Sequence, residues 1–140
     1  MNKKENLIEV NHLSVTFYNG KDENHAVQDV TFKIKKGEVL GIVGESGSGK
    51  SVSAMSIMQL IPYPPGKITG GEIIFKGENL LDKTEGEMMK IRGNQISVIF
   101  QEPMTSFNPL YTIGSQIEEA IMLHQKKSKK EAEQMAIELL

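Results

Sequence analysis

Residues 44–51, with the sequence GESGSGKS, have the types and spacing of a loop that binds phosphate groups. The stretch fits the pattern G-x-x-x-x-G-K-[ST], in which glycines let the backbone curl until successive N–H groups point inward at an anion. Lys50 would bring a positive charge to the β- and γ-phosphates of a nucleotide, and the Ser51 hydroxyl is an oxygen ligand suited to Mg²⁺. The predicted phosphate site comprises Gly44, Glu45, Ser46, Gly47, Ser48, Gly49, Lys50 and Ser51.

Such a loop is a convincing phosphate site only between a strand and a helix, and the flanking residues predict both. Residues 39–43 (VLGIV) are continuously apolar, which is typical of a strand that is buried on both faces. An amphipathic helix is predicted to begin at about Lys50 and to end before Pro62. A chance match to the motif in a chain of this composition has a probability on the order of one per cent. The loop is therefore predicted to bind a nucleotide.

The remaining elements make the front of the chain rich in strands and the back helical. Residues 7–17 are typical of a strand, with alternating apolar and polar side chains over 13–17. Residues 30–34 alternate again, and the turn dipeptide Asn19-Gly20 lies between the two segments. Residues 71–77 predict a short strand, 85–91 a brief helix and 96–100 a second strand of the buried type. Two helices follow from residue 113 onward, with a lysine cluster between them (Lys126, Lys127, Lys129, Lys130). The pattern predicts an α/β fold with at least one buried parallel strand.

Composition excludes several classes of protein. The chain of 140 residues carries 16 Lys and Arg against 18 Asp and Glu, so there is no basic field for nucleic acid. It contains no cysteine, which rules out disulfides, a thiolate zinc site and a thiol nucleophile. No apolar run approaches the roughly 18 residues of a membrane helix, and the first residues do not have the pattern of a secretory signal. We expect a soluble, intracellular protein.

A carboxylate that would complete a catalytic site is missing where it is most expected. Phosphate-loop enzymes commonly place an acid at the end of a second strand, but none of the three aspartates (Asp22, Asp29, Asp82) follows an apolar run. Residues 96–100 end instead in Gln101 and Glu102. Glu102 is a candidate catalytic base, and a small phosphate-loop kinase is one alternative. Pro103 follows it directly, and Arg92 is the only arginine for holding an acceptor.

The sequence resembles the N-terminal part of an ATP-binding-cassette (ABC) transporter ATPase, and is most similar to the dipeptide and oligopeptide importers. The resemblance covers essentially all 140 residues and rests on the phosphate loop, on residues 66–73 (GKITGGEI) and on 99–110 (IFQEPMTSFNPL). It implies a phosphate-loop NTPase (RecA-like) core with an antiparallel β subdomain, cut off before or within the helical subdomain. Residues 1–100 would form the β subdomain and core. Residues 101–140 would form the glutamine loop and the start of the helical subdomain.

The resemblance also implies roles for residues outside the phosphate loop. Gln101 would contact Mg²⁺ and the attacking water when ATP is bound. Phe17, or its neighbour Tyr18, would stack on adenine. Residues 104–111 would receive a coupling helix of the transmembrane permease, with Met104, Phe107 and Leu110 in the groove. The subgroup usually has leucine where Phe107 stands.

Other elements of the family's ATP site are not in this sequence. The Leu-Ser-Gly-Gly-Gln signature, the second carboxylate motif and the switch histidine are absent, and we interpret His124 as a helix residue. The resemblance implies an ATP-binding subunit, or a truncated form, of a peptide importer, located on the cytoplasmic face of the membrane. Its cofactors would be ATP and Mg²⁺, and its partners permease subunits and a second ATPase subunit. We expect weak nucleotide binding, little or no hydrolysis, and residues 39–43 and 96–100 short of strand neighbours; a non-catalytic docking fragment is a further alternative.

Overall fold

The structure is a computed structural model that describes residues 5–101 and 107–140. The chain divides into two compact units, Met1–Met88 and Met89–Leu140, which we describe one at a time. The mixed strand and helix content confirms the predicted α/β class. The predicted division of the chain after residue 100 stays a prediction.

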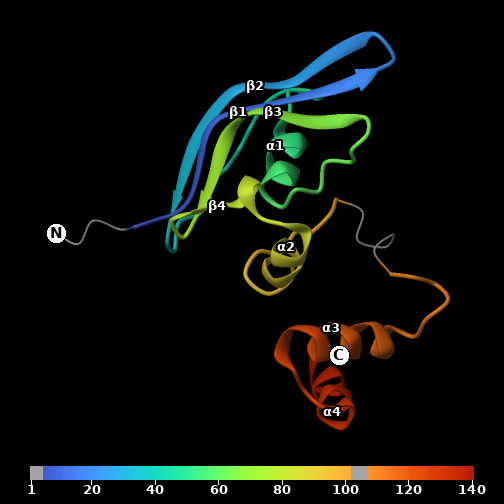
Figure 1. Cartoon of the computed structure of the whole chain (residues 1–140). Coiled ribbons are helices and arrows are strands. Elements are labelled where there is room, and N and C mark those ends of the chain that lie inside the picture. The colour runs from blue at the N-terminus through green and yellow to red at the C-terminus, as the bar shows by residue number, and fades with distance from the viewer. Residues whose placement is uncertain (1–4, 102–106) are drawn as a thin grey trace. The chain divides into compact units, whose positions relative to one another are not determined.

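The first unit is built on a four-stranded antiparallel sheet in the order β2-β1-β3-β4 (Figure 1). Its strands are β1 (Asn6–Asn19), β2 (Asp22–Lys35), β3 (Gly66–Phe75) and the short β4 (Glu78–Asn79). The predicted hairpin turn is confirmed, because β1 ends at Asn19 and Gly20 follows with a φ of 65°. The strands β2 and β3 are longer than the alternation of their side chains indicated.

Irregular pairing explains why β2 was predicted to begin only at Val30. Val15 pairs with Val27, but the next residue of β1, Thr16, pairs with His25, so Ala26 is an extra residue on β2. A second shift lies between the pairs Leu13–Val30 and Val15–Val27. Each bulge moves the side chains out of a simple period of two, and periodicity therefore fails along the first half of β2.

The core of the first unit lies between this sheet and helix α1 (Lys50–Ile57). Four fully buried side chains come from the two central strands: Val10, Leu13, Val15 and Ile73. The helix lies beside the sheet (Figure 1) and contacts β1 and β2. It buries Ser53 and Ser56. Burying apolar side chains such as these contributes about 1.5–3 kcal/mol each, which is the main stabilisation available to the unit. The short helix η1 (Leu80–Asp82) follows β4 and buries Leu80.

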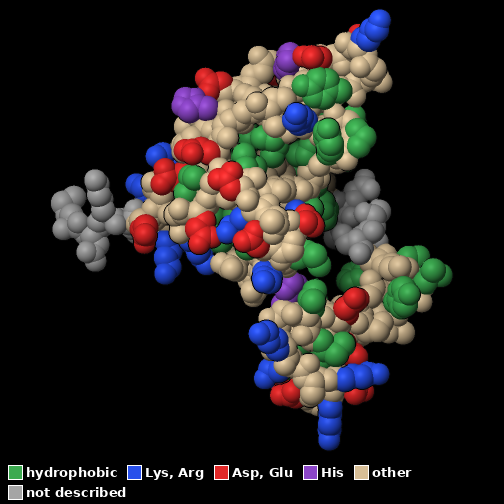
Figure 2. All heavy atoms as spheres, in the orientation of Figure 1, with side chains coloured by type: hydrophobic (Ala, Val, Ile, Leu, Met, Phe, Trp, Pro, Cys, Tyr) green, Lys and Arg blue, Asp and Glu red, His purple; other side chains and the backbone are tan. Residues whose placement is uncertain are grey.

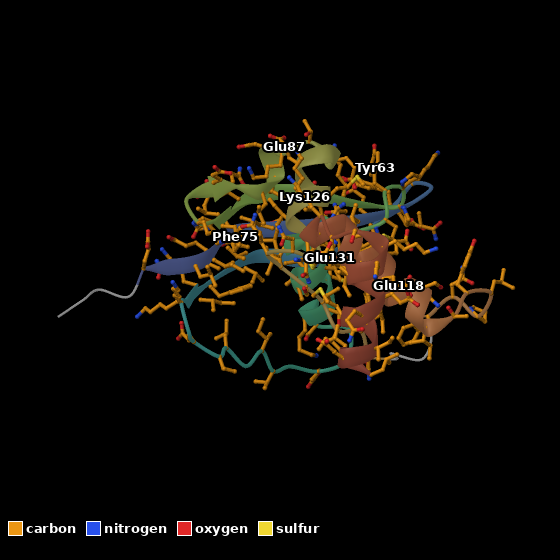
Figure 3. All side chains as sticks on the ribbon, turned by 90° about the horizontal axis from the view of Figure 1, so that it is seen from below. Tyr63, Phe75, Glu87, Glu118, Lys126 and Glu131 are labelled. Atoms are coloured by element: carbon orange, nitrogen blue, oxygen red, sulfur yellow. The ribbon has the colours of Figure 1, made fainter. Side chains whose placement is uncertain are left out.

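The two predicted strands of the buried type are not strands in the structure. Residues 39–43 belong to an open segment between β2 and α1 (Figure 3), and Val39 and Val43 are 97% and 93% exposed. In residues 96–100 the β pairing is limited to a bridge between Arg92 and Ile96, and Ile99 is exposed. A strand needs a neighbour for its backbone N–H and C=O groups. Neither segment has a strand neighbour in the described part of the chain. This agrees with the expectation that both segments are short of strand neighbours.

The second unit contains a helical hairpin, which confirms the two predicted helices. The helices are α3 (Ile113–Gln125) and α4 (Lys129–Leu139), and the helix α2 (Glu85–Ile91) spans the boundary between the units. Buried Ile121 of α3 packs with Ala132 and Ala136 of α4. Among the described residues, no helix is long and apolar enough to cross a membrane.

The connection between these two helices is locally encoded. Lys126, which Figure 3 labels, ends α3. Its backbone is left-handed, with a φ of 54°. Ser128 then caps α4 in a reciprocal capping box with Glu131, which satisfies two backbone N–H groups at the start of the helix. The hydrogen bonds from Ser128 hold the pKa of the Glu131 carboxyl below its ordinary value.

Candidate phosphate site

The predicted phosphate loop leads directly into α1. Gly47 and Gly49 have φ values of 80° and 85°, a left-handed conformation that glycine adopts without strain. The first hydrogen bond of the helix runs from the Ser53 N–H to the Gly49 carbonyl at 2.8 Å. The backbone N–H groups of residues 50–52 precede that bond and have no helical acceptor, so they are available to an anion.

The Lys50 side chain folds back over the loop. Its Nζ donates to the carbonyl oxygens of Gly44 and Glu45, at 2.7 Å and 2.6 Å, and lies 3.3 Å from the Ser48 Oγ. These bonds hold the ammonium charge beside the inward-curving backbone. Phosphate oxygens entering the loop would meet a lysine that is already in place.

The remaining features of the loop also suit a phosphate with its metal ion. Gly47 faces open space, since a Cβ built there would meet nothing within 4 Å. The first turn of α1 contains no acidic residue that would compete with an anion for the positive end of the helix. Ser51 is exposed on that turn, where its hydroxyl is free to act as a hard oxygen ligand. The donor set therefore fits a phosphate with Mg²⁺.

The described residues bring no cluster of acidic or histidine side chains to the loop for holding a metal. Within residues 5–101 and 107–140, the structure contains no group of three or more His, Cys, Asp or Glu side chains that would hold a metal ion. The protein ligands predicted for Mg²⁺ from the sequence are Ser51 and Gln101, which phosphate oxygens would join. Acidic and basic side chains are interspersed over the face seen in Figure 2, without one dominant sign.

Phe17, the predicted adenine-stacking residue, lies near the end of β1. It is half-buried, and its ring approaches Gly66 so closely that a Cβ there would lie 2.8 Å from Cε1. Phe17 and the more exposed Tyr18 line a cavity of about 430 Å³ together with Asn24 and Pro65. The phosphate loop does not line this cavity as far as the chain is described. The stacking role of Phe17 stays a prediction.

Gln101, Phe107 and Leu110 belong to the second unit. Gln101 is exposed and is the last residue described before residues 102–106. Phe107 and Leu110 are also exposed, as the docking prediction requires. Glu102 and Met104 lie outside the described residues, so their predicted roles stay predictions.

His124 is a half-buried residue of α3, which confirms its interpretation as part of a helix. Its ring packs against the Gly93 turn, where a Cβ would lie 2.7 Å from Nε2. The φ of Gly93 is 76°, so glycine is needed here both for conformation and for space.

Two residues that touch the phosphate loop were missed by the sequence reasoning. Ala26 and Val27 of β2 lie against Gly49. The apolar pair Ala26-Val27 was a sign that the strand begins before residue 30. The bulge at Ala26 separates this pair from the alternating residues 30–34. Only the three-dimensional register brings this part of β2 to the loop.

Comparison with known proteins decides the family. The family model described as ABC transporter matches residues 27–139, which is most of the chain. The chain belongs to the ABC transporter family. The ABC match includes the phosphate loop, Gln101 and both helices of the second unit.

The relatives of this ABC chain include peptide transport proteins. It is 49% identical to the oligopeptide transport ATP-binding protein OppD of Bacillus subtilis and 51% identical to AppD of the same organism, over 96% of its length. The chain spans only 37% of OppD and 41% of AppD. It therefore corresponds to less than half of either relative.

A solved structure confirms the ABC cassette fold. The chain superposes on the dimeric ATP-binding cassette MJ0796 bound to ADP and Pi with a TM-score of 0.79 and 28% identity. The match covers 94% of this chain and 54% of the cassette. The predicted phosphate-loop NTPase class is thus confirmed, while the residues that contact nucleotide here remain to be proposed.

Proposed function

We propose that this chain is the ATP-binding portion of an ABC importer for peptides, and that it binds Mg²⁺–ATP through residues 44–51. The relatives named above are oligopeptide transport proteins, and the superposed cassette is bound to ADP and Pi. The cassette supports a nucleotide as the ligand, and the relatives support a peptide as the transported substrate.

One observation carries the proposal: the loop places unbonded N–H groups, a helix N-terminus and the Lys50 ammonium around one concave backbone segment. The backbone N–H groups of residues 50–52 would bind phosphate oxygens, and Lys50 would exchange its bonds to Gly44 and Glu45 for bonds to the phosphates. When bound, Mg²⁺ supplies charge neutralisation across the β- and γ-phosphates. The Ser51 hydroxyl would hold it.

Further roles are proposed for residues outside the loop. Phe17 would stack on the base, for which stacking on an aromatic ring is worth about 1–3 kcal/mol. Gln101 would reach Mg²⁺ and the attacking water through its amide, which coordinates and releases without a change of charge. The partners would be transmembrane permease subunits and a second ATPase subunit, at the cytoplasmic face of the membrane.

The proposal predicts binding without efficient turnover by this chain. In ABC ATPases the site is completed by a signature sequence and a second carboxylate motif, neither of which occurs in these 140 residues. Removing a group that stabilises the transition state typically lowers the rate by about two to three orders of magnitude. ATP hydrolysis by the chain alone should therefore be near the background rate.

Calorimetric titration with Mg²⁺–ATP tests the proposal. The chain should bind ATP, and Lys50→Ala should weaken binding at least about tenfold because a charge-assisted contact to phosphate is lost. Lys36→Ala is the matched control, since it removes the same charge from an exposed turn before the open segment. Equal affinities for the wild type and Lys50→Ala would refute the assignment. Rapid phosphate release that Lys50→Ala abolishes would refute the claim of low turnover.

A docking module without turnover is a second candidate, favoured by the exposed apolar side chains Phe107 and Leu110. Such groups are typical of surfaces that contact a partner. Capture of permease that persists in Lys50→Ala but is lost in Leu110→Ser would support this alternative. The kinase alternative predicts phosphoryl transfer to a small acceptor that Glu102→Gln abolishes.

A further inference from the structure

The last glycine of the phosphate loop lies directly against β2. A Cβ built on Gly49 would lie 2.4 Å from the Ala26 carbonyl oxygen and 3.1 Å from the Val27 Cγ2. No side chain fits at the first distance, so the loop backbone approaches the strand as closely as glycine allows. Gly49 itself is buried.

This contact joins the loop to the sheet of the first unit. The open segment 39–43 precedes the loop and is largely exposed, so it offers little support from the N-terminal side. A Cβ at Gly47 would meet nothing, and one at Gly44 would meet only Ser48 and Lys50 of the loop itself. Among the loop glycines, Gly49 alone touches described residues outside the loop and α1.

The bulge in β2 creates the surface on which Gly49 rests. Ala26 is the extra residue between the pairs Val15–Val27 and Thr16–His25, and it has no partner on β1. Val27 is 4% exposed and lies opposite fully buried Val15, so its side chain is fixed in the core. A fixed methyl group beneath Gly49 sets how deeply the loop can sit.

We propose that Val27, together with the Ala26 bulge, positions the phosphate loop for nucleotide binding, although neither residue belongs to the loop. The inference rests on the proposed function of residues 44–51. Val27 acts through Gly49, whose depth sets the directions of the neighbouring N–H groups. Donors that are held in place before the ligand arrives bind more tightly than donors that must be ordered on binding. Val27 is a positioning residue that contributes to nucleotide affinity.

Three variants separate positioning from ordinary core packing. Val27→Ala removes the Cγ2 methyl beneath Gly49, and ATP affinity should fall about tenfold. Val27→Thr fills the same volume, with its hydroxyl oxygen in place of the Cγ2 methyl beneath Gly49. The buried hydroxyl should lower stability, while the retained volume should keep affinity within about twofold. Val10→Ala is the packing control, because Val10 is fully buried on β1 and pairs with Phe32 and Ile73, away from the loop.

Two measurements on each variant test the positioning role of Val27: the calorimetric affinity for Mg²⁺–ATP and the denaturation midpoint. The inference is upheld if affinity falls in Val27→Ala but not in Val10→Ala or Val27→Thr. It is overturned if Val27→Ala binds like the wild type, or if affinity follows stability across all three. If Val27→Ala does not fold, Val27→Leu replaces it, because its longer side chain stays apolar but crowds Gly49. Wild-type affinity in Val27→Leu would equally overturn the inference.

A second readout separates this inference from the proposed function. If the wild type and Lys50→Ala bind ATP equally, the proposed function fails. Amide hydrogen exchange then still tests whether Val27 positions the loop. The Ser48 and Ser53 N–H groups donate to the Glu45 and Gly49 carbonyls, and their exchange should be faster in Val27→Ala than in Val10→Ala. Equal exchange rates in the two variants would overturn the inference without reference to any nucleotide.

Discussion

The strands of the antiparallel sheet and the open segment 39–43 contain similar apolar residues but differ in what surrounds them. Val15 of β1 is fully buried, whereas Val39 is 97% exposed. The strand β1 is joined to β2 by a tight hairpin and pairs along its length with β2 and β3. Segment 39–43 has no strand neighbour among the described residues. An apolar pattern therefore indicates that a segment should be buried, but not that its partner lies within the same stretch of chain.

The largest loss of stability is expected when a buried side chain of the sheet is truncated. Leu13→Ala should lower the free energy of unfolding by about 2–5 kcal/mol, because it leaves a cavity between β1 and its neighbours. Denaturant unfolding measures the change. A loss below about 1 kcal/mol would show that the sheet is not the stable centre of the first unit.

A smaller loss of stability is expected at the helical hairpin, which like the β1–β2 hairpin is closed by residues near in sequence. Ser128→Ala removes the cap of α4 and should cost about 0.5–2 kcal/mol of helix stability. Circular dichroism during unfolding measures it, with Glu133→Ala at an exposed position of α4 as a control.

The same capping box gives a pH dependence. Because the pKa of Glu131 is lowered in the folded state, its contribution is present above the ordinary carboxyl range and is lost as the pH falls through the lowered pKa. The stability difference between wild type and Glu131→Gln should therefore shrink in acid. A difference that is independent of pH would contradict the role of the ionised carboxylate.

The smallest effect on folding is expected in the open segment. Val39→Ala should change the free energy of unfolding by less than about 0.5 kcal/mol, because a nearly fully exposed side chain loses almost no contacts. Val39→Lys should instead reduce self-association in light scattering, since charge on an unpaired apolar segment opposes edge-to-edge pairing. If Val39→Ala destabilised the protein as much as Leu13→Ala, the contrast between the two regions would be wrong.

Elements with local signals could be predicted from the sequence, and elements that depend on distant partners could not. The hairpin at Asn19-Gly20, the helix over 85–91 and the start of α1 at Lys50 all follow from nearby residues. The start of β2 was misplaced because the Ala26 bulge interrupts its periodicity. Residues 39–43 were predicted as a strand, but hydrophobicity alone cannot supply the missing hydrogen-bond partners.

The candidate site divides in the same way. The spacing of Gly44, Gly49, Lys50 and Ser51 indicated a phosphate loop at the start of a helix, and the structure places them there. The contact of Val27 with Gly49 could not be predicted, because it joins residues 22 positions apart through an irregular register. The roles of Phe17 and Gln101 come from family resemblance and stay predictions.

Backbone amide NMR during titration with Mg²⁺–ATP tests the central claim most directly, because it reports which residues meet the ligand. The account predicts that the largest shift changes fall on the amides of Gly47, Gly49, Lys50 and Ser51, and that Lys50→Ala strongly reduces them. Shift changes spread elsewhere on the chain, or unchanged in Lys50→Ala, would contradict the assignment of residues 44–51 as the nucleotide phosphate site.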